Sequence, residues 1–185
     1  MYPPRLLTLT LLLTGLVLSS CAGMKERTKQ ASPEGLVTYS LQNGSDASLE
    51  VFYNRPSKKG RVIFGELVPF GEVWRTGANE ATTFTTNVPL LIGGEELPEG
   101  KYTIWTIPGP SEWTVIFNTK MYSWGVSWGG KASRDPDHDE LSIKVPVEIL
   151  QEVTEMFTID LRNQDPVEMH LMWDQTRVVV PMYVK

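Results

Sequence analysis

The sequence predicts an all-β protein, an antiparallel β-sandwich of jelly-roll-like type with about eight to ten strands. Three observations predict this class. From residue 36 onward apolar residues alternate with polar ones in successive runs, turn-forming residues separate the runs, and a helical period is nearly absent. Many short strands separated by turns are typical of sandwiches and barrels.

The expected strands follow one another along the chain. Alternating runs occupy residues 49–53, 102–107, 113–118, 141–145, 157–161, 167–173 and 178–184. Turn signals separate them at Asn43-Gly44, Gly93-Gly94, Pro98-Glu99-Gly100, Pro108-Gly109-Pro110, Gly129-Gly130 and residues 163–166. Only Pro146–Val153 is expected to form a helical turn or two, with proline at its start. No repeat or second domain is evident, so residues 36–185 are expected to form one domain.

The first 21 residues have the layout of a bacterial lipoprotein signal peptide. A basic residue, Arg5, precedes an apolar stretch that is too short for a membrane span of ~20 residues. The ending Leu18-Ser19-Ser20-Cys21 resembles a lipobox, which implies that Cys21 becomes a diacylated N-terminus carrying fatty acids such as palmitate. The alternative is a plain secretory signal with a chance cysteine.

Residues 22–35 are polar and have no apolar period, which predicts a flexible linker between the lipid and the folded body. Two acyl chains, at ~0.8 kcal/mol per buried methylene, anchor a protein stably to a bilayer. The expected partner is therefore a membrane, reached through Cys21. The linker has no acidic run after the cysteine, so we expect the periplasmic face of the outer or inner membrane of the cell envelope.

Composition narrows the function further. The 185 residues contain 17 Lys and Arg against 22 Asp and Glu, a net charge of −5, whereas nucleic-acid binding calls for a basic face. Cys21 is the sole cysteine, so neither a disulfide nor thiolate catalysis is expected. Removal of residues 1–21 leaves 164, enough for one domain that buries about 70% of its unfolded surface.

Residues 53–82 interrupt the strand pattern with a long connection, and long ordered loops are often functional. A guanidinium, an amide, a carboxylate and an indole together can orient a polar ligand such as a sugar or a carboxylate. Alternatively, Trp74 packs into one end of the sandwich and Arg75 pairs with Glu80 to fasten the loop. The candidate binding residues are Arg55, Arg61, Trp74, Arg75, Asn79 and Glu80.

Four segments carry a family resemblance: residues 53–61, 64–82, 97–109 and 112–118. They closely resemble an uncharacterised bacterial family, the domain of unknown function numbered 2911, whose members are mostly secreted or lipid-anchored envelope proteins. The resemblance covers roughly residues 34–165, and the part from Asp165 matches less clearly. It implies no established reaction, cofactor or catalytic residue.

Other polar groups offer weaker signals. The basic run of Arg55, Lys58, Lys59 and Arg61 could meet a phosphate, a headgroup or an acidic glycan, or could form a solvated turn. Residues 135–140, with His138, hold the densest set of oxygen ligands but lack the glycine and spacing of a calcium loop. His170 is predicted to be exposed on the polar face of its strand.

Six tryptophans could include a stacking platform. Trp113 and Trp173 lie on the apolar phase of their strands and are expected in the core, whereas Trp105, Trp124 and Trp128 are candidates for exposure.

These observations favour a non-enzymatic, lipid-anchored binding module for a small polar ligand, a glycan or an envelope protein, without a cofactor or metal. One alternative is a hydrolase that uses Glu80 or Glu72 as general acid or base, with Glu66 as a further carboxylate. The other is a structural or assembly subunit of the envelope.

Overall fold

The computed structural model describes residues 31–40 and 46–185. The expected signal peptide, the acylation site at Cys21 and most of the expected linker lie outside these residues. β1 begins at Glu34, so the last two residues of the expected linker belong to a strand. In the described part of the chain, no helix has the length and apolar character needed to cross a membrane.

The regular secondary structure of the described residues is almost entirely β. A single 3₁₀ turn, η1, spans Pro136–His138. The strands are β1 (Glu34–Ser40), β2 (Ser48–Asn54), β3 (Thr83–Thr86), β4 (Leu90–Ile92), β5 (Glu95–Leu97), β6 (Gly100–Ile107), β7 (Glu112–Asn118), β8 (Asp139–Arg162) and β9 (Val167–Val184).

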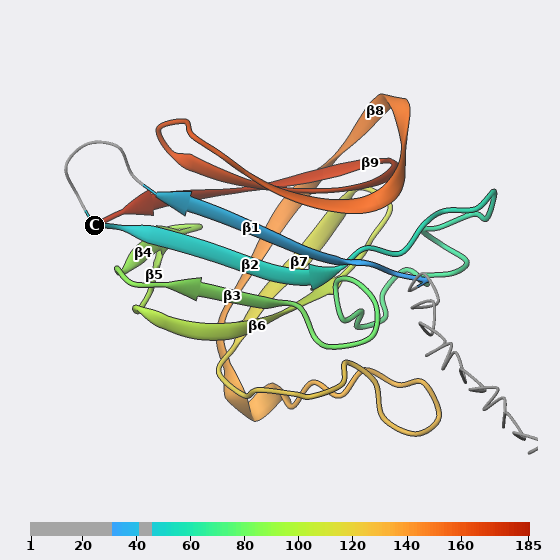
Figure 1. Ribbon diagram of the computed structural model, residues 1–185, viewed down its shortest axis with the longest axis horizontal. Coiled ribbons are helices and arrows are strands. Elements are labelled where there is room, and N and C mark those ends of the chain that lie inside the picture. The colour runs from blue at the N-terminus through green and yellow to red at the C-terminus, as the bar shows by residue number, and fades with distance from the viewer. Residues whose placement is uncertain (1–30, 41–45) are drawn as a thin grey trace, which may run out of the picture.

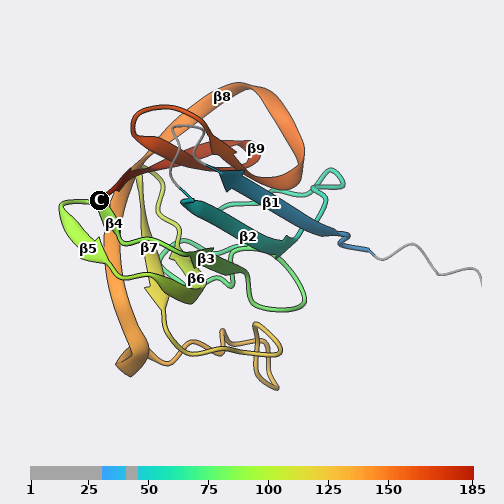
Figure 2. The ribbon, with the colours of Figure 1, turned by 60° about the vertical axis from the view of Figure 1, so that its left-hand side comes forward.

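All nine strands pair antiparallel in the order β1-β2-β3-β6-β7-β8-β9-β4-β5. The sheet folds over on itself, so that β8 and β9 form a layer above β1 and β2 (Figure 1). The 60° turned view shows the same two layers (Figure 2). The predicted all-β, sandwich-like class is confirmed.

β8 joins the two layers because it is long and bent. Its first part pairs with β7, up to Pro146 opposite Glu112, and its second part pairs with β9 from Val147 onward. Register shifts on either side of Thr154 bend the strand, as bulges do. The helical turn expected over residues 146–153 is therefore wrong: the segment belongs to β8, with Pro146 paired to β7 and residues 147–149 paired to β9.

The alternating side chains form the core between the layers. In β2, Leu49, Val51 and Tyr53 are buried, while Ser48 and Glu50 on the other face are exposed. The hydroxyl of Tyr53 donates to the carbonyl of Ile159 (3.2 Å) and accepts from the amide of the same residue (3.0 Å). This exchange fastens β2 to β8 across the sandwich. Trp113 and Trp173 are buried, as predicted.

A second, smaller core lies on the outer face of β6 and β7. It consists of Trp105, Ile116 and Ala81, and side chains from the flanking loops pack against it, among them Tyr122 and Ala132. Trp105 is 0% exposed, so its proposed exposure is wrong. The alternation correctly placed Trp105 on the face opposite to Tyr102 and Ile104, but two loops cover that face. Trp124 and Trp128 are exposed, Trp128 completely.

His170 is buried, with 3% of its surface exposed, so the prediction of an exposed side chain is also wrong. Its Nε2 lies 2.8 Å from a carboxylate oxygen of Glu168, which is itself only partly exposed. Met172, on the same face of β9, is likewise only partly exposed. Alternation identified the face of the strand, but neighbouring side chains on that face exclude solvent.

Two long loops meet at one end of the sandwich. The first, residues 55–82, connects β2 to β3, and the second, residues 119–138, connects β7 to β8. The amide of Gly125 donates to the carbonyl of Asn79 at 3.0 Å, which links the loops directly. The second loop projects from the body below β6 (Figures 1 and 2).

Candidate functional site

The two loops enclose a cleft of about 590 Å³. Its lining also includes Ala31 and Ser32, just ahead of β1. Four of the six predicted binding residues line it: Arg61, Trp74, Arg75 and Asn79. The structure therefore brings most of the predicted set together at one concave surface.

The other two predicted residues are not among those lining the cleft. Arg55 donates from Nε to the carbonyl of Phe157 (3.4 Å) and from Nη2 to the hydroxyl of Thr158 (3.2 Å), which ties β2 to β8. Glu80 accepts a hydrogen bond from Nδ2 of the fully buried Asn54 at 2.8 Å. Both side chains thus have structural partners.

Trp74 forms one wall of the cleft and also packs against the core. Its backbone exchanges hydrogen bonds with Thr106 of β6 (2.7 and 3.0 Å), and its indole donates to the carbonyl of Gly77 (3.1 Å). The ring stacks on Trp173, which also lines the cleft, with centroids 5.9 Å apart and an interplanar angle of 19°. The expected packing of Trp74 into the sandwich and its place in the cleft are therefore compatible.

The segment after Trp74 adopts an uncommon backbone conformation. Thr76 and Asn79 have φ of 55° and 57°, a left-handed region that is costly for a β-branched residue such as threonine. The hydroxyl of Thr76 lies 3.1 Å from that of Thr106, and the hydroxyl of Thr82 donates to the Thr76 carbonyl at 2.6 Å. These buried bonds hold a strained turn beside the cleft, an arrangement that is frequent at functional sites.

Arg75 is the exceptional side chain of the cleft. Within the described residues its guanidinium makes no hydrogen bond and no ion pair, so the expected Arg75–Glu80 pair is not formed. Burial lowers the pKa of the Arg75 guanidinium, and the charge of Glu80 opposes this shift. The side chain is thus a partly desolvated cation that lacks a direct partner.

The basic run of the first loop divides into two pairs. Besides Arg55, Lys58 is structural, because its ammonium lies 2.6 Å from a carboxylate oxygen of Asp174. Lys59 and Arg61 instead line the cleft. Arg61 is fixed there by bonds from Nε to the Lys58 carbonyl (3.0 Å) and from Nη2 to the Ser57 carbonyl (2.5 Å).

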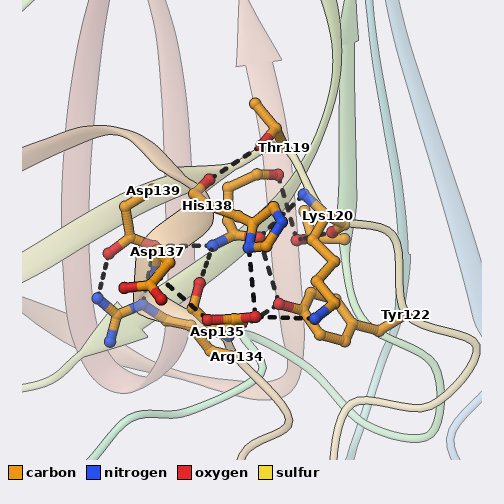
Figure 3. Close-up of polar contacts among 10 residues, drawn as sticks. Thr119, Lys120, Tyr122, Arg134, Asp135, Asp137, His138 and Asp139 are labelled. Carbon is orange, nitrogen blue, oxygen red and sulfur yellow. Dashed lines mark hydrogen bonds and ion pairs between the residues drawn. The ribbon is translucent and has the colours of Figure 1, made fainter.

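The acidic run of the second loop is engaged in a hydrogen-bonded network (Figure 3). Asp135 pairs with Lys120 (2.8 Å) and lies 3.2 Å from Nδ1 of His138, while Asp139 pairs with Arg134. In the part of the chain that the structure describes, no group of three or more metal-ligating side chains is present. Asp135 and Asp139 therefore neutralise neighbouring cations, whereas Asp137 and Glu140 form no ion pair within the described residues.

Several lining residues could not be identified from the sequence. Trp173 reaches the cleft from β9, and Val126, Gly130 and Ala132 reach it from the second loop. The glycine-rich segment 124–130 was the one available signal, because glycines allow close approach of backbones. A Cβ at Gly125 would lie 2.4 Å from Cδ of Arg75, so glycine at this position makes room for the arginine.

Comparison with known proteins identifies a family. The model of the family described as "Protein of unknown function (DUF2911)" matches residues 32–182. The chain therefore belongs to this family, and the match extends beyond the 34–165 range of the sequence resemblance. No curated protein and no solved structure matches the chain.

Proposed function

We propose that this member of the DUF2911 family is a lipid-anchored binding module of the bacterial cell envelope, and that its cleft holds a small polar ligand. The observation that carries the proposal is the convergence of Trp74, Arg75, Asn79 and Arg61 on one cleft of about 590 Å³. Volumes of about 300–1,000 Å³, with apolar walls and a few placed polar groups, are typical of ligand sites.

The location belongs to the same proposal. Acylation of Cys21 supplies the anchor, and residues 22–33 supply the linker. Ala31 and Ser32 line the cleft, so the cleft lies at the end of the body where the linker joins. We place the protein on the periplasmic side of the outer or inner membrane, where the linker keeps a site near this junction within reach of the membrane surface.

The number of carboxylates in the cleft favours a binding function over a hydrolytic one. Glycoside hydrolysis by acid and base requires two of them. Among the described residues that line the cleft, Glu72 is the single carboxylate, and Glu80 is hydrogen-bonded to Asn54. A concave cleft also differs from the flat apolar patch expected of an assembly subunit.

A binding screen with a blocked cleft tests the proposal. The purified lipoprotein in detergent is titrated by calorimetry with small neutral and charged sugars, amino acids and organic acids. Val126→Trp should fill the cleft, whereas Ser127→Trp places the same ring on the exposed, non-lining neighbour. We expect at least one compound to bind the wild type and Ser127→Trp but not Val126→Trp. Absence of binding, or binding unaffected by Val126→Trp, would contradict the proposal.

A further inference from the structure

The state of Arg75 points to the charge of the ligand. A guanidinium offers five N–H donors, and removing such a cation from water without a partner is unfavourable. Elsewhere in the described chain, Arg134 and Arg177 each pair with a carboxylate. Arg75 lines the cleft without such a pair, although Glu80 interacts with it electrostatically. An anion that enters the cleft would supply the missing partner.

The stem of Arg75 is seated firmly enough to pre-orient its charged end. The backbone of Gly125 lies so close that a Cβ there would be 2.4 Å from Cδ and 2.7 Å from Cβ of Arg75. Gly125 in turn is fixed by its hydrogen bond to Asn79, and its carbonyl accepts from Ser133 at 3.2 Å. A donor that is already positioned loses little conformational entropy when it binds.

Two further cations border the same cleft. Arg61 uses Nε and Nη2 to bind backbone carbonyls, which leaves Nη1 for a ligand. Lys59 is exposed, and in the described chain its ammonium forms no hydrogen bond or ion pair. Against these three cations the described residues of the lining contribute one carboxylate, that of Glu72. The cleft is thus locally positive in a chain whose net charge is −5, which favours anionic ligands.

Part of the cleft wall is apolar. It includes the partly exposed Val73 and Trp74, with the buried Trp173 stacked on Trp74, so a ligand with an organic body can contact the Trp74 ring while its charged group meets the arginines. Inorganic phosphate alone would satisfy the cations but not this wall.

We infer that the cleft binds a small organic anion, whose carboxylate or phosphate is gripped by Arg75 and flanked by Arg61 and Lys59. This inference rests on the proposed function and specifies its ligand class. Arginine is suited to the role because its planar fork can make two parallel hydrogen bonds to one carboxylate or phosphate group.

Matched sugars test the inference. Glucose, glucuronate and glucose 6-phosphate share a pyranose ring and differ in charge, and inorganic phosphate lacks the organic body. Each is titrated calorimetrically into the detergent-solubilised lipoprotein at low salt. We expect glucuronate or glucose 6-phosphate to bind at least tenfold more tightly than glucose and inorganic phosphate. The better of the two anions identifies the charged group.

Substitutions assign the effect to Arg75. Arg75→Gln should weaken binding of the anionic sugar by about 10- to 100-fold, the loss expected for a hydrogen-bonded charge pair. Arg75→Lys should restore it only in part, because an ammonium lacks the fork. Arg177→Gln removes a cation outside the cleft and should leave the affinity unchanged. Circular dichroism would verify that each variant is folded.

The outcomes separate this inference from the proposed function. Glucose binding as tightly as its anionic relatives, or anion binding unaffected by Arg75→Gln, would overturn the inference and leave a neutral-ligand module. If none of the four probes binds, the inference is also overturned, and the wider screen with Val126→Trp then decides the proposed function alone.

Discussion

Two loops pack together at one end of the sandwich, and they differ in whether their arginines pair with carboxylates. In the second loop, residues 119–138, Lys120 pairs with Asp135, and the single arginine, Arg134, pairs with Asp139 at the start of β8 (Figure 3). In residues 55–82, Arg75 reaches the cleft without a direct partner in the described chain.

This difference indicates which charged side chains stabilise a loop and which are available to a ligand. Paired side chains with shared hydrogen bonds hold a loop in one conformation, and their removal leaves a partner unsatisfied. A cation that is held in position but has no ionic partner, such as Arg75, contributes less to the stability of the ligand-free protein than a paired one. The density of charged residues along the sequence is therefore a poor guide to a site, since two carboxylates of the densest run, Asp135 and Asp139, pair with the neighbouring cations Lys120 and Arg134.

The largest expected effect comes from the centre of the paired network. Asn118 is fully buried, and its Nδ2 donates to the Asp135 carbonyl and the Asp139 carboxylate, both at 2.8 Å. Its Oδ1 accepts from the Lys120 amide at 3.0 Å. Asn118→Ala should lower the free energy of unfolding by about 3 kcal/mol, because several buried polar groups lose their partners at about 1–3 kcal/mol each.

Urea denaturation monitored by tryptophan fluorescence measures this loss. Gln151→Ala, an exposed substitution on β8, serves as the control and should change stability by no more than about 0.5 kcal/mol. A loss below 1 kcal/mol for Asn118→Ala would show that the network does not fasten the second loop.

The next effect compares one arginine from each loop. Arg134→Gln should cost about 2 kcal/mol, because Asp139, which is largely buried, loses its cation. Arg75→Gln should leave stability within about 0.5 kcal/mol of the wild type or raise it, since a desolvated cation without a direct partner is replaced by a neutral amide. The same denaturation assay measures both. Equal losses for the two variants would abolish the distinction between the loops.

Much of the architecture could be predicted from local pattern. Alternation identified β2, β6 and β7, because a half-buried strand leaves a period-two record in its own residues. The continuity of β8 could not be predicted, since its middle, Pro146–Val153, has little alternation and its first residues are held extended by pairing with β7 and β9. Pairing between strands distant in sequence decided this segment over its local preference.

The sequence predicted which loop forms the cleft and what chemistry it offers, but only some of the residues that line it. Chemistry alone singled out Trp74, Arg75 and Asn79, because a long loop with a guanidinium, an indole and an amide is unusual in a strand-rich chain. The partners of Arg55 and Glu80 could not be foreseen, since Phe157 and Asn54 belong to strands whose approach depends on the complete fold. Trp105 likewise could not be assigned correctly, because its place in the strand alternation indicated an exposed side chain and the loops that cover it are distant in sequence.

A methyl group at Gly125 tests whether the close packing of Arg75 against Gly125 is needed for anion binding. The added Cβ would lie 2.4 Å from Cδ of Arg75, closer than real contacts allow, so the arginine must shift. Gly125→Ala should cost about 1–2 kcal/mol, as overpacking does, and should also weaken binding of the anionic sugar. In Gly100→Ala the nearest atom would be the Tyr102 hydroxyl at 3.3 Å, a milder contact at a residue that does not line the cleft, so anion affinity should stay unchanged whatever the variant loses in stability. Unaltered anion affinity in Gly125→Ala would mean that binding does not need the close packing of Arg75 against Gly125.

The smallest expected effect is the pH dependence of the exposed pair Lys120–Asp135. The hydrogen bond from Lys120 holds the pKa of Asp135 below its ordinary 3.8, and the bond to Asp135 raises the pKa of Lys120 above 10.5. The stabilisation from Asp135 is therefore present above pH 3.8 and lost as pH falls through its lowered pKa. That from Lys120 is present below pH 10.5 and lost as pH rises through its raised pKa.

The difference in unfolding free energy between the wild type and Lys120→Met should accordingly be constant from about pH 5 to 9 and shrink outside this window. His138, which lies 3.2 Å from the same carboxylate, is present in both proteins, so the subtraction isolates Lys120. High salt should reduce the difference, since exposed pairs are screened. A difference that persists unchanged down to pH 2 would show that Lys120 stabilises the second loop through packing of its stem, and charge pairing would then no longer distinguish this loop from the cleft.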